Sequence, residues 1–250
     1  MPSIATSLPL APKVSLPRRG LKMLGYAVAP TILSLLASVY TASPDFFLQY
    51  IHEDTRRELM AVELTTVVCA GLGGVLLLAA ALRRAKAGQK SAASLVAVVG
   101  CAALFFAGEE MSWGQSYFGW KTPSSFAAFS RETNLHNSSL GVQSFGNLFL
   151  IVVFFVLPGW AWLKRRKGPT VLAAWRSAIA SGPVVCCVAA GFLWKEIKNL
   201  YRFWYADHRE HLVYQEFIMH MNEHKELLVA VALFMFGVMQ VRDAFANKRA

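Results

Sequence analysis

Glutamate and histidine are the side chains in this sequence best able to do chemistry, and they gather in three segments. In the first, 108–115, the adjacent carboxyl groups of Glu109 and Glu110 follow the charge-free run 91–108. Carboxylates at membrane depth are costly and usually serve a functional site. On a helix that continues through Trp113, Glu109 and Trp113 share a face, while Glu110 points about 100° away. The alternative is that the two acids only mark the membrane boundary.

The second segment, 131–137, contains Glu132 and His136, which face the same way if the segment is helical. It follows Thr122 and Pro123, a hydroxyl N-cap and then a proline at the first helical position. Phenylalanines recur at helical spacing after this start. We therefore predict a short amphipathic helix over 122–130, in the loop after the third membrane span, that lies on the outer membrane surface.

The third segment, 214–227, carries a polar stripe. On a helix Glu216, His220 and Glu223 fall within one narrow stripe, and His224 lies about 40° further round. Two histidines four residues apart can bind one metal ion, and the string from His220 to His224 matches the H-x-x-E-H of inverted zinc peptidases. Too few acids follow to supply the usual further ligand, so such a peptidase is not expected. The alternative is an interfacial stripe that pairs with lysines and arginines across the loop.

Part of these segments resembles a known pattern. Residues 109–115 read E-E-M-S-W-G-Q, and Phe118-Gly, Thr122-Pro123 and Asn134-Leu-His-Asn137 follow. This resembles the E-E-x-S-W-G-Q … F-G … T-P … N-L-H-N motif of a family of uncharacterised bacterial integral membrane proteins. The resemblance covers about 30 of the 250 residues. It implies a multi-pass fold in a bacterial inner membrane and assigns no catalytic role to any residue.

The composition indicates which elements must position these side chains. The chain is 55% hydrophobic and 16% charged, with a mean hydropathy of +0.41, whereas soluble domains carry about 25% charged residues. A conventional soluble enzyme and a disordered chain are therefore excluded. The net charge of +10 does not predict nucleic-acid binding, because the basic residues cluster at the ends of apolar runs. All four cysteines lie inside apolar runs, so no disulfide framework is implied.

The apolar runs predict an all-α fold, a polytopic membrane helix bundle with six transmembrane helices. The transmembrane domain covers 23–243, between a flexible basic cytoplasmic tail at 1–22 and a cytoplasmic tail at 244–250. The predicted spans lie at about 23–44, 62–82, 91–113, 140–163, 176–194 and 214–241.

The lysines and arginines predict the orientation. Sixteen of the 25 lie in one alternating set of loops and ends, which places both termini in the cytoplasm and the protein in the cell membrane. With this orientation, 14 of the 15 acidic residues and all six histidines fall on the outer side, and only Asp243 does not. The polar chemistry is therefore expected to face outward.

Three functions fit these patterns. One is a docking subunit or assembly factor of the cell envelope. Another is a metal-dependent membrane hydrolase or transferase, with Zn, Mn or Fe, that acts on a lipid-type substrate. The third is a carrier of protons, metal ions or small cations. The expected partners are the bilayer and an envelope protein or a lipid-type substrate.

One pocket at the outer end of the bundle is expected to hold the site, with the helix over 122–130 as its lid. The candidate catalytic residues are Glu109, Glu110, His136 and Glu223. The candidate metal ligands are His136, Glu216, His220 and His224.

Overall fold

The computed structural model describes residues 61–127, 135, 142–165, 178–204 and 212–246. Its longer helices are α3 (Ala61–Lys86), α4 (Lys90–Glu110), α7 (Val142–Ile151), α8 (Leu157–Arg165), α9 (Gly182–Trp204) and α10 (Leu212–Ala246). Three short helices follow α4, namely a 3-10 turn (Ser112–Gly114), α5 (Gln115–Phe118) and α6 (Ser124–Ala127). No strand occurs in the described ranges, so the predicted all-α fold class is confirmed.

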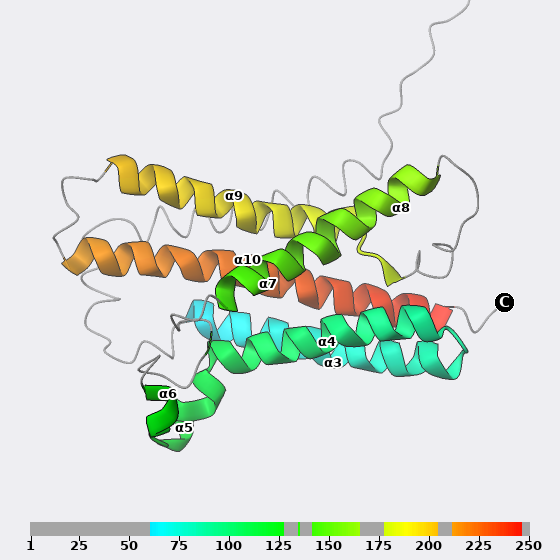
Figure 1. Ribbon diagram of the computed structural model, residues 1–250, viewed down its shortest axis with the longest axis horizontal. Coiled ribbons are helices and arrows are strands. Elements are labelled where there is room, and N and C mark those ends of the chain that lie inside the picture. The colour runs from blue at the N-terminus through cyan, green and yellow to red at the C-terminus, as the bar shows by residue number, and fades with distance from the viewer. Residues whose placement is uncertain (1–60, 128–134, 136–141, 166–177, 205–211, 247–250) are drawn as a thin grey trace, which may run out of the picture.

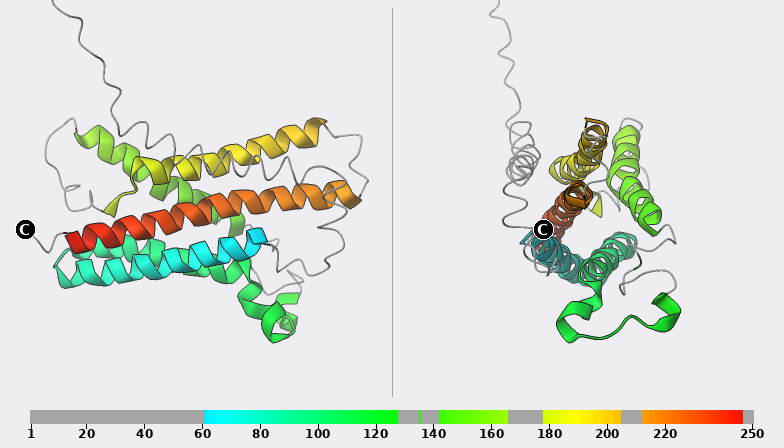
Figure 2. Two further views of the ribbon diagram at one scale, coloured as in Figure 1. Left: turned by 180° about the vertical axis from the view of Figure 1, so that it is seen from behind. Right: turned by 90° about the vertical axis from the view of Figure 1, so that its left-hand side faces the viewer.

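The helices form an antiparallel bundle with two chemically different ends (Figures 1 and 2). α3, α7 and α10 begin at the end where α4 and α9 finish. We call this the acidic end, and its described carboxylates include Glu63, Glu109, Glu110, Glu223 and Glu226. The opposite, basic end carries Arg83, Arg84, Lys86, Lys90 and Arg242. α3 packs against α4 and α10, and α10 packs against α9 as well.

Within the described residues, four helices are long and apolar enough to cross a membrane, which indicates a membrane protein. They are Val62–Lys86, Lys90–Glu110, Gln143–Leu163 and Glu223–Ala246, and they correspond to the predicted second, third, fourth and sixth spans. The predicted first span, 23–44, lies outside the described residues. The fifth, 176–194, falls on α9, which runs on to Trp204 through several charged residues and is not among the four. The six-span count stays a prediction.

The end of α4 differs from the prediction. The helix stops at Glu110 and does not continue to residue 113, because Ser112, Trp113 and Gly114 have φ angles of 45°, 55° and 82°. These angles are left-handed and incompatible with a right-handed helix. The predicted helix over 122–130 is not confirmed either. The structure describes one turn there, α6, and residues 128–130 lie outside the described ranges.

Glycines allow close approach of the spanning helices. A Cβ atom on Gly73 would lie 2.8 Å from the backbone nitrogen of Phe234, and one on Gly237 would lie 2.8 Å from the carbonyl oxygen of Gly73. α3 and α10 therefore touch backbone to backbone, as is common where small residues mediate packing in a membrane. The core between the two ends is apolar in the described residues and includes Leu77 and Phe154.

A wide turn separates α7 from α8. Val152–Val156 are π-helical, and Val153 and Phe154 within this turn are buried. Pro158 follows two residues later and has no N–H to donate to the carbonyl of Phe154. Widening of the helix before this proline accommodates the missing hydrogen bond.

A buried arginine links neighbouring elements at the basic end. Arg84 is 1% exposed, and its guanidinium donates to the amide oxygen of Gln240 at 2.8 Å and to that of Gln89 at 3.1 Å. These bonds join α3 to α10 and to the turn that precedes α4. The guanidinium of Arg84 is therefore held by amide oxygens within the packed bundle, and it also interacts electrostatically with Asp243.

Candidate functional site

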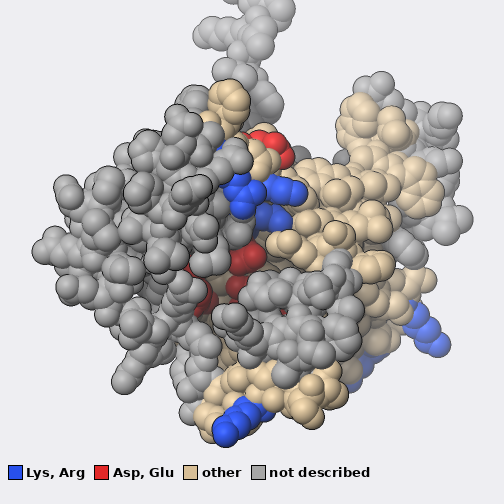
Figure 3. Space-filling model, turned by 60° about the vertical axis from the view of Figure 1, so that its left-hand side comes forward, with Lys and Arg blue, Asp and Glu red and all other residues tan. Residues whose placement is uncertain are grey.

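Carboxylates from three helices gather at the acidic end. Glu110 on α4 interacts electrostatically with Glu63 on α3, with Glu109, and with Glu223 and Glu226 on α10. Figure 3 looks toward this end and shows acidic side chains set into a hollow, beside lysine and arginine side chains. The structure thus brings Glu109, Glu110 and Glu223 of the predicted site into one cluster.

Glu109 fixes the turn that follows α4. Its side chain is 2% exposed, and one carboxylate oxygen accepts a hydrogen bond from Trp113 Nε1 at 2.7 Å. The other oxygen accepts a short hydrogen bond from the backbone N–H of Leu135. The carboxylate therefore holds the left-handed turn and a distant loop residue at the same point.

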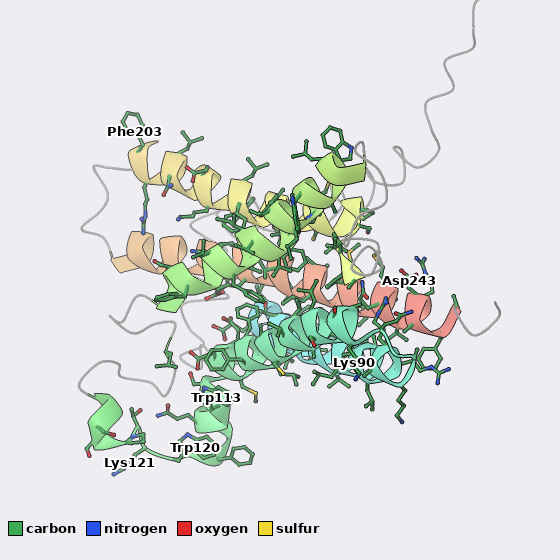
Figure 4. All side chains as sticks on the ribbon, turned by 45° about the vertical axis from the view of Figure 1, so that its right-hand side comes forward. Lys90, Trp113, Trp120, Lys121, Phe203 and Asp243 are labelled. Carbon is green, nitrogen blue, oxygen red and sulfur yellow. The ribbon has the colours of Figure 1, made fainter. Side chains whose placement is uncertain are left out.

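The Trp113 ring folds back over the end of α4. It packs edge-on against Phe105, with ring centroids 5.6 Å apart, and a Cβ atom on Gly108 would lie 2.8 Å from it. Figure 4 shows Trp113 at the end of α4 opposite Lys90, with Trp120 and Lys121 on the segment that leads away from the bundle. The absence of a side chain at Gly108 thus makes room for this contact.

A pocket of about 520 Å³ lies between α4, α7 and α10. Its polar part lies at the acidic end and is lined by Glu109, Glu110, Gln143, Asn147, Lys225 and Glu226. Its apolar part extends along the helices and includes Phe106, Phe149, Leu150, Val229 and Leu233. The pocket therefore has a charged head region and an apolar body.

The pocket is open on the side between α4 and α7. Phe105 and Phe145 line it and remain 43% and 72% exposed. α4 and α7 lie on the near side of the bundle in Figure 1, with α10 behind them. α4 and the segment that contains α7 are both long and apolar enough to cross a membrane.

Lys225 joins three helices beside the carboxylates. Its ammonium group donates to the amide oxygen of Asn147 on α7 at 2.9 Å and lies 5.6 Å from the centre of the Phe192 ring on α9. Glu226, the next residue, also interacts with it electrostatically. Lys225 therefore offsets part of the negative charge at the head of the pocket.

The predicted histidines do not form a described metal site. His224 is 2% exposed and packs against Trp194 of α9, with ring centroids 5.7 Å apart, so it belongs to the α9–α10 contact. Among the described residues, no group of three His, Cys, Asp or Glu could hold a metal ion. His136 and the side chains of Glu216 and His220 lie outside what the structure describes, although both of the latter residues fall within α10.

Sequence reasoning did not single out several residues of the pocket. Glu226 lies three residues after Glu223, a spacing that places both near one helix face. Asn147 and Gln143 are amides within an otherwise apolar span, and such residues often face a bundle interior. Glu63 lies in the first turn of α3, and no comparable sequence pattern predicted that it lies near Glu110.

Comparison with protein-family models, curated proteins and solved structures finds no match for this chain.

Proposed function

We propose that this membrane protein binds a lipid-type molecule in the pocket between α4, α7 and α10. The observation that carries the proposal is the shape and polarity of that pocket. Its apolar body lies along membrane-crossing helices, it opens between α4 and α7, and its polar head lies where α4 ends. A molecule with a hydrocarbon chain and a polar head group matches this arrangement.

The polar residues at the head of the pocket determine which lipid the pocket selects. An apolar chain gains little when it moves from a bilayer into a protein, because lipid tails are as apolar as the side chains of the pocket. Groups that recognise a head must therefore distinguish one lipid from another, and a few placed polar groups do this in small-molecule sites. Glu110, Gln143, Asn147, Lys225 and Glu226 are polar residues that line this part of the pocket.

A hydrolase or transferase that acts on such a lipid is the enzymatic form of this proposal. Carboxylates beside a bound head group can exchange protons with it, which is the role of a general acid or base. Glu110 and Glu226 both line the pocket and interact with one another, so they are the proposed pair. Glu109 is instead a positioning residue, since it holds Trp113 and Leu135.

A bulky side chain in the pocket tests the proposal. Gly146 lines the pocket, and a Cβ atom there would meet no atom within 4 Å, so Gly146→Phe fills the space with no clash at its Cβ. Gly159 has equally open surroundings but does not line the pocket, so Gly159→Phe is the matched control. Lipids that co-purify with the protein should be identified by mass spectrometry. We expect Gly146→Phe alone to lose a lipid species that the wild type retains, and retention by both variants would contradict the proposal.

A docking role is the second candidate, and one exposed pair of rings favours it. Phe118 and Trp120 stack with centroids 5.4 Å apart and are 74% and 44% exposed. A photo-crosslinking residue at position 118 tests this role in intact membranes. Protein adducts that require Trp120 support an envelope partner. Lipid adducts alone place these rings in the membrane interface and remove the docking role.

A further inference from the structure

We propose that the basic end of the bundle binds the head group of an anionic phospholipid at the α3–α4 turn, residues 87–89. This turn lies at the opposite end of α4 from the polar part of the pocket, so the proposal does not depend on the lipid-binding function above. Three features of the turn carry it: its depth in the membrane, the cations around it and the beginning of α4.

The turn lies at the depth of the lipid head groups. Val62–Lys86 and Lys90–Glu110 are both long and apolar enough to cross a membrane, and only three residues separate them. With 25 and 21 residues, they are roughly 38 and 32 Å long at 1.5 Å per residue, close to the ~30 Å of the hydrocarbon core. With both helices across a membrane, the turn therefore lies beside the phosphate groups of one leaflet.

Hydrogen bonds hold the turn in one shape. Arg84 donates from its guanidinium to the amide oxygen of Gln89 at 3.1 Å, and the backbone N–H of Gln89 donates to the carbonyl oxygen of Arg84 at 2.9 Å. Gly88 has a φ of 78°, in the left-handed region that glycine adopts easily. The backbone between Lys86 and Lys90 is therefore preorganised, which lowers the entropy that binding costs.

Three cations surround the turn, and none forms an ion pair with an acid in the described part of the chain. Lys86 and Lys90 are exposed, and Arg83 is half-buried. The acid that the described ranges place at this end is Asp243, which pairs with Arg242 at 3.2 Å. Figure 4 shows Lys90 and Asp243 at the same end of the bundle. Clusters of lysine and arginine at a membrane surface attract anionic lipids, so a lipid phosphate gains from all three charges.

The beginning of α4 favours an anion at the same place. The first N–H groups of a helix have no acceptor within the helix and carry the positive end of its dipole. α4 has no acid in its first turn, its N-cap Gln89 makes no side-chain cap hydrogen bond, and Lys90 is its first residue. A cation there is unfavourable, and a bound phosphate offsets it.

The depth of the turn selects a lipid as the source of the phosphate, because lipid phosphates are concentrated at this level of the membrane. The head group of phosphatidylglycerol carries a phosphate with no ammonium group to offset its charge. Phosphatidylcholine carries both charges in one head group. The charges around the turn therefore favour the anionic lipid over the zwitterionic one.

Variants with matched charge test the proposal. The full-length protein is purified in detergent, and native mass spectrometry measures its affinity for phosphatidylglycerol and for phosphatidylcholine with the same acyl chains. The turn variant combines Lys86→Gln with Lys90→Gln. The control variant combines Lys121→Gln with Lys195→Gln, which removes two exposed lysines that lie away from the basic end. Thermal unfolding shows that both variants are folded.

We expect the wild type to prefer phosphatidylglycerol and the turn variant to bind it about 25-fold more weakly, because each basic residue near a membrane surface contributes about fivefold. The control variant should keep the wild-type preference. A variant with Lys86→Arg and Lys90→Arg keeps the charge and should keep the preference as well. High salt should weaken the binding, because the lysines are exposed. Gly146→Phe, which fills the pocket, should leave the preference unchanged.

Each failure has a distinct result. Equal affinity of the wild type for the two lipids overturns the proposal. An equal loss in the turn variant and the control variant assigns the preference to net charge and overturns the turn as its site. Loss of the preference in Gly146→Phe moves the lipid to the pocket. Displacement of phosphatidylglycerol by soluble glycerol phosphate at the same concentration replaces the lipid with a free phosphate.

Discussion

Replacement of Glu109 should release the segment around Leu135 from the end of α4. Each of the two carboxylate oxygens accepts one hydrogen bond, from Trp113 Nε1 and from the Leu135 N–H. Glu109→Gln keeps one acceptor oxygen and places an N–H₂ group against the other donor. One of the two donors therefore loses its acceptor, whichever way the amide is oriented.

The magnitude follows from the charge of the acceptor. A hydrogen bond to a charged group contributes about 1.5–3 kcal/mol, and a factor of ten in an equilibrium constant corresponds to about 1.4 kcal/mol. If the loop opens locally, exchange of the Leu135 amide hydrogen should become about 10- to 100-fold faster in Glu109→Gln. Glu109→Ala removes both bonds and should accelerate exchange further.

Hydrogen exchange of the Leu135 amide in nanodiscs is the assay. Trp113→Phe removes the indole donor but leaves the carboxylate to Leu135, so its effect should be smaller than that of Glu109→Gln. Glu196→Gln, at an exposed position on α9, is the control and should leave exchange unchanged. Exchange at Leu135 that is unaltered in both Glu109 variants, at wild-type thermal stability, would refute the reasoning.

The remaining predictions concern the packing and the topology. Gly237→Ala should lower the free energy of unfolding by about 1–3 kcal/mol through overpacking against Gly73, whereas Gly159→Ala, in open space, should be neutral or slightly stabilising in thermal unfolding. Arg84→Met should cost about 3 kcal/mol, because it leaves the buried amide of Gln240 without this donor. Arg83→Met, which removes only a cation–π contact to Phe245, should cost about 0.5–1 kcal/mol; equal losses would contradict the role of Arg84. Cysteines at positions 86 and 167 should react with impermeant reagent only from the cytoplasm, and a cysteine at 121 only from outside. The opposite pattern would reverse the predicted topology.

Hydropathy predicts the spanning helices well because each one carries its own signal. The charge-free runs that end near Lys86 and Glu110 correspond closely to α3 and α4. The end of α9 was harder to predict. Charged residues follow its apolar run, and a hydropathy argument ends the span at 194, whereas the backbone continues as a helix to Trp204.

The candidate site is only partly readable in the sequence because its contacts are long-range. The paired acids at 109 and 110 are visible as charges after an apolar run, and α10 brings Glu223 to them. The left-handed turn at Ser112 and Trp113 was not predicted, since neither residue type favours that conformation, and the Leu135 N–H that binds Glu109 beside it lies 26 positions further along the chain. The bond between Lys225 and Asn147 joins residues 78 positions apart and has no local signature.

The π-helical turn at Val152–Val156 determines how α7 is rotated about the helix axis relative to α8, within the third of the four described spans. A π turn holds one residue more than an α turn. The extra residue therefore rotates α7 about the helix axis relative to α8. Loss of one residue there would turn α7 by about 100° relative to α8. The hydrogen bond between Lys225 and Asn147 would then be lost. Other side chains of α7 would line the pocket, although the mean hydropathy of the span would hardly change. Homologous chains that lack this extra residue are therefore expected to present a different side of α7 to the carboxylates.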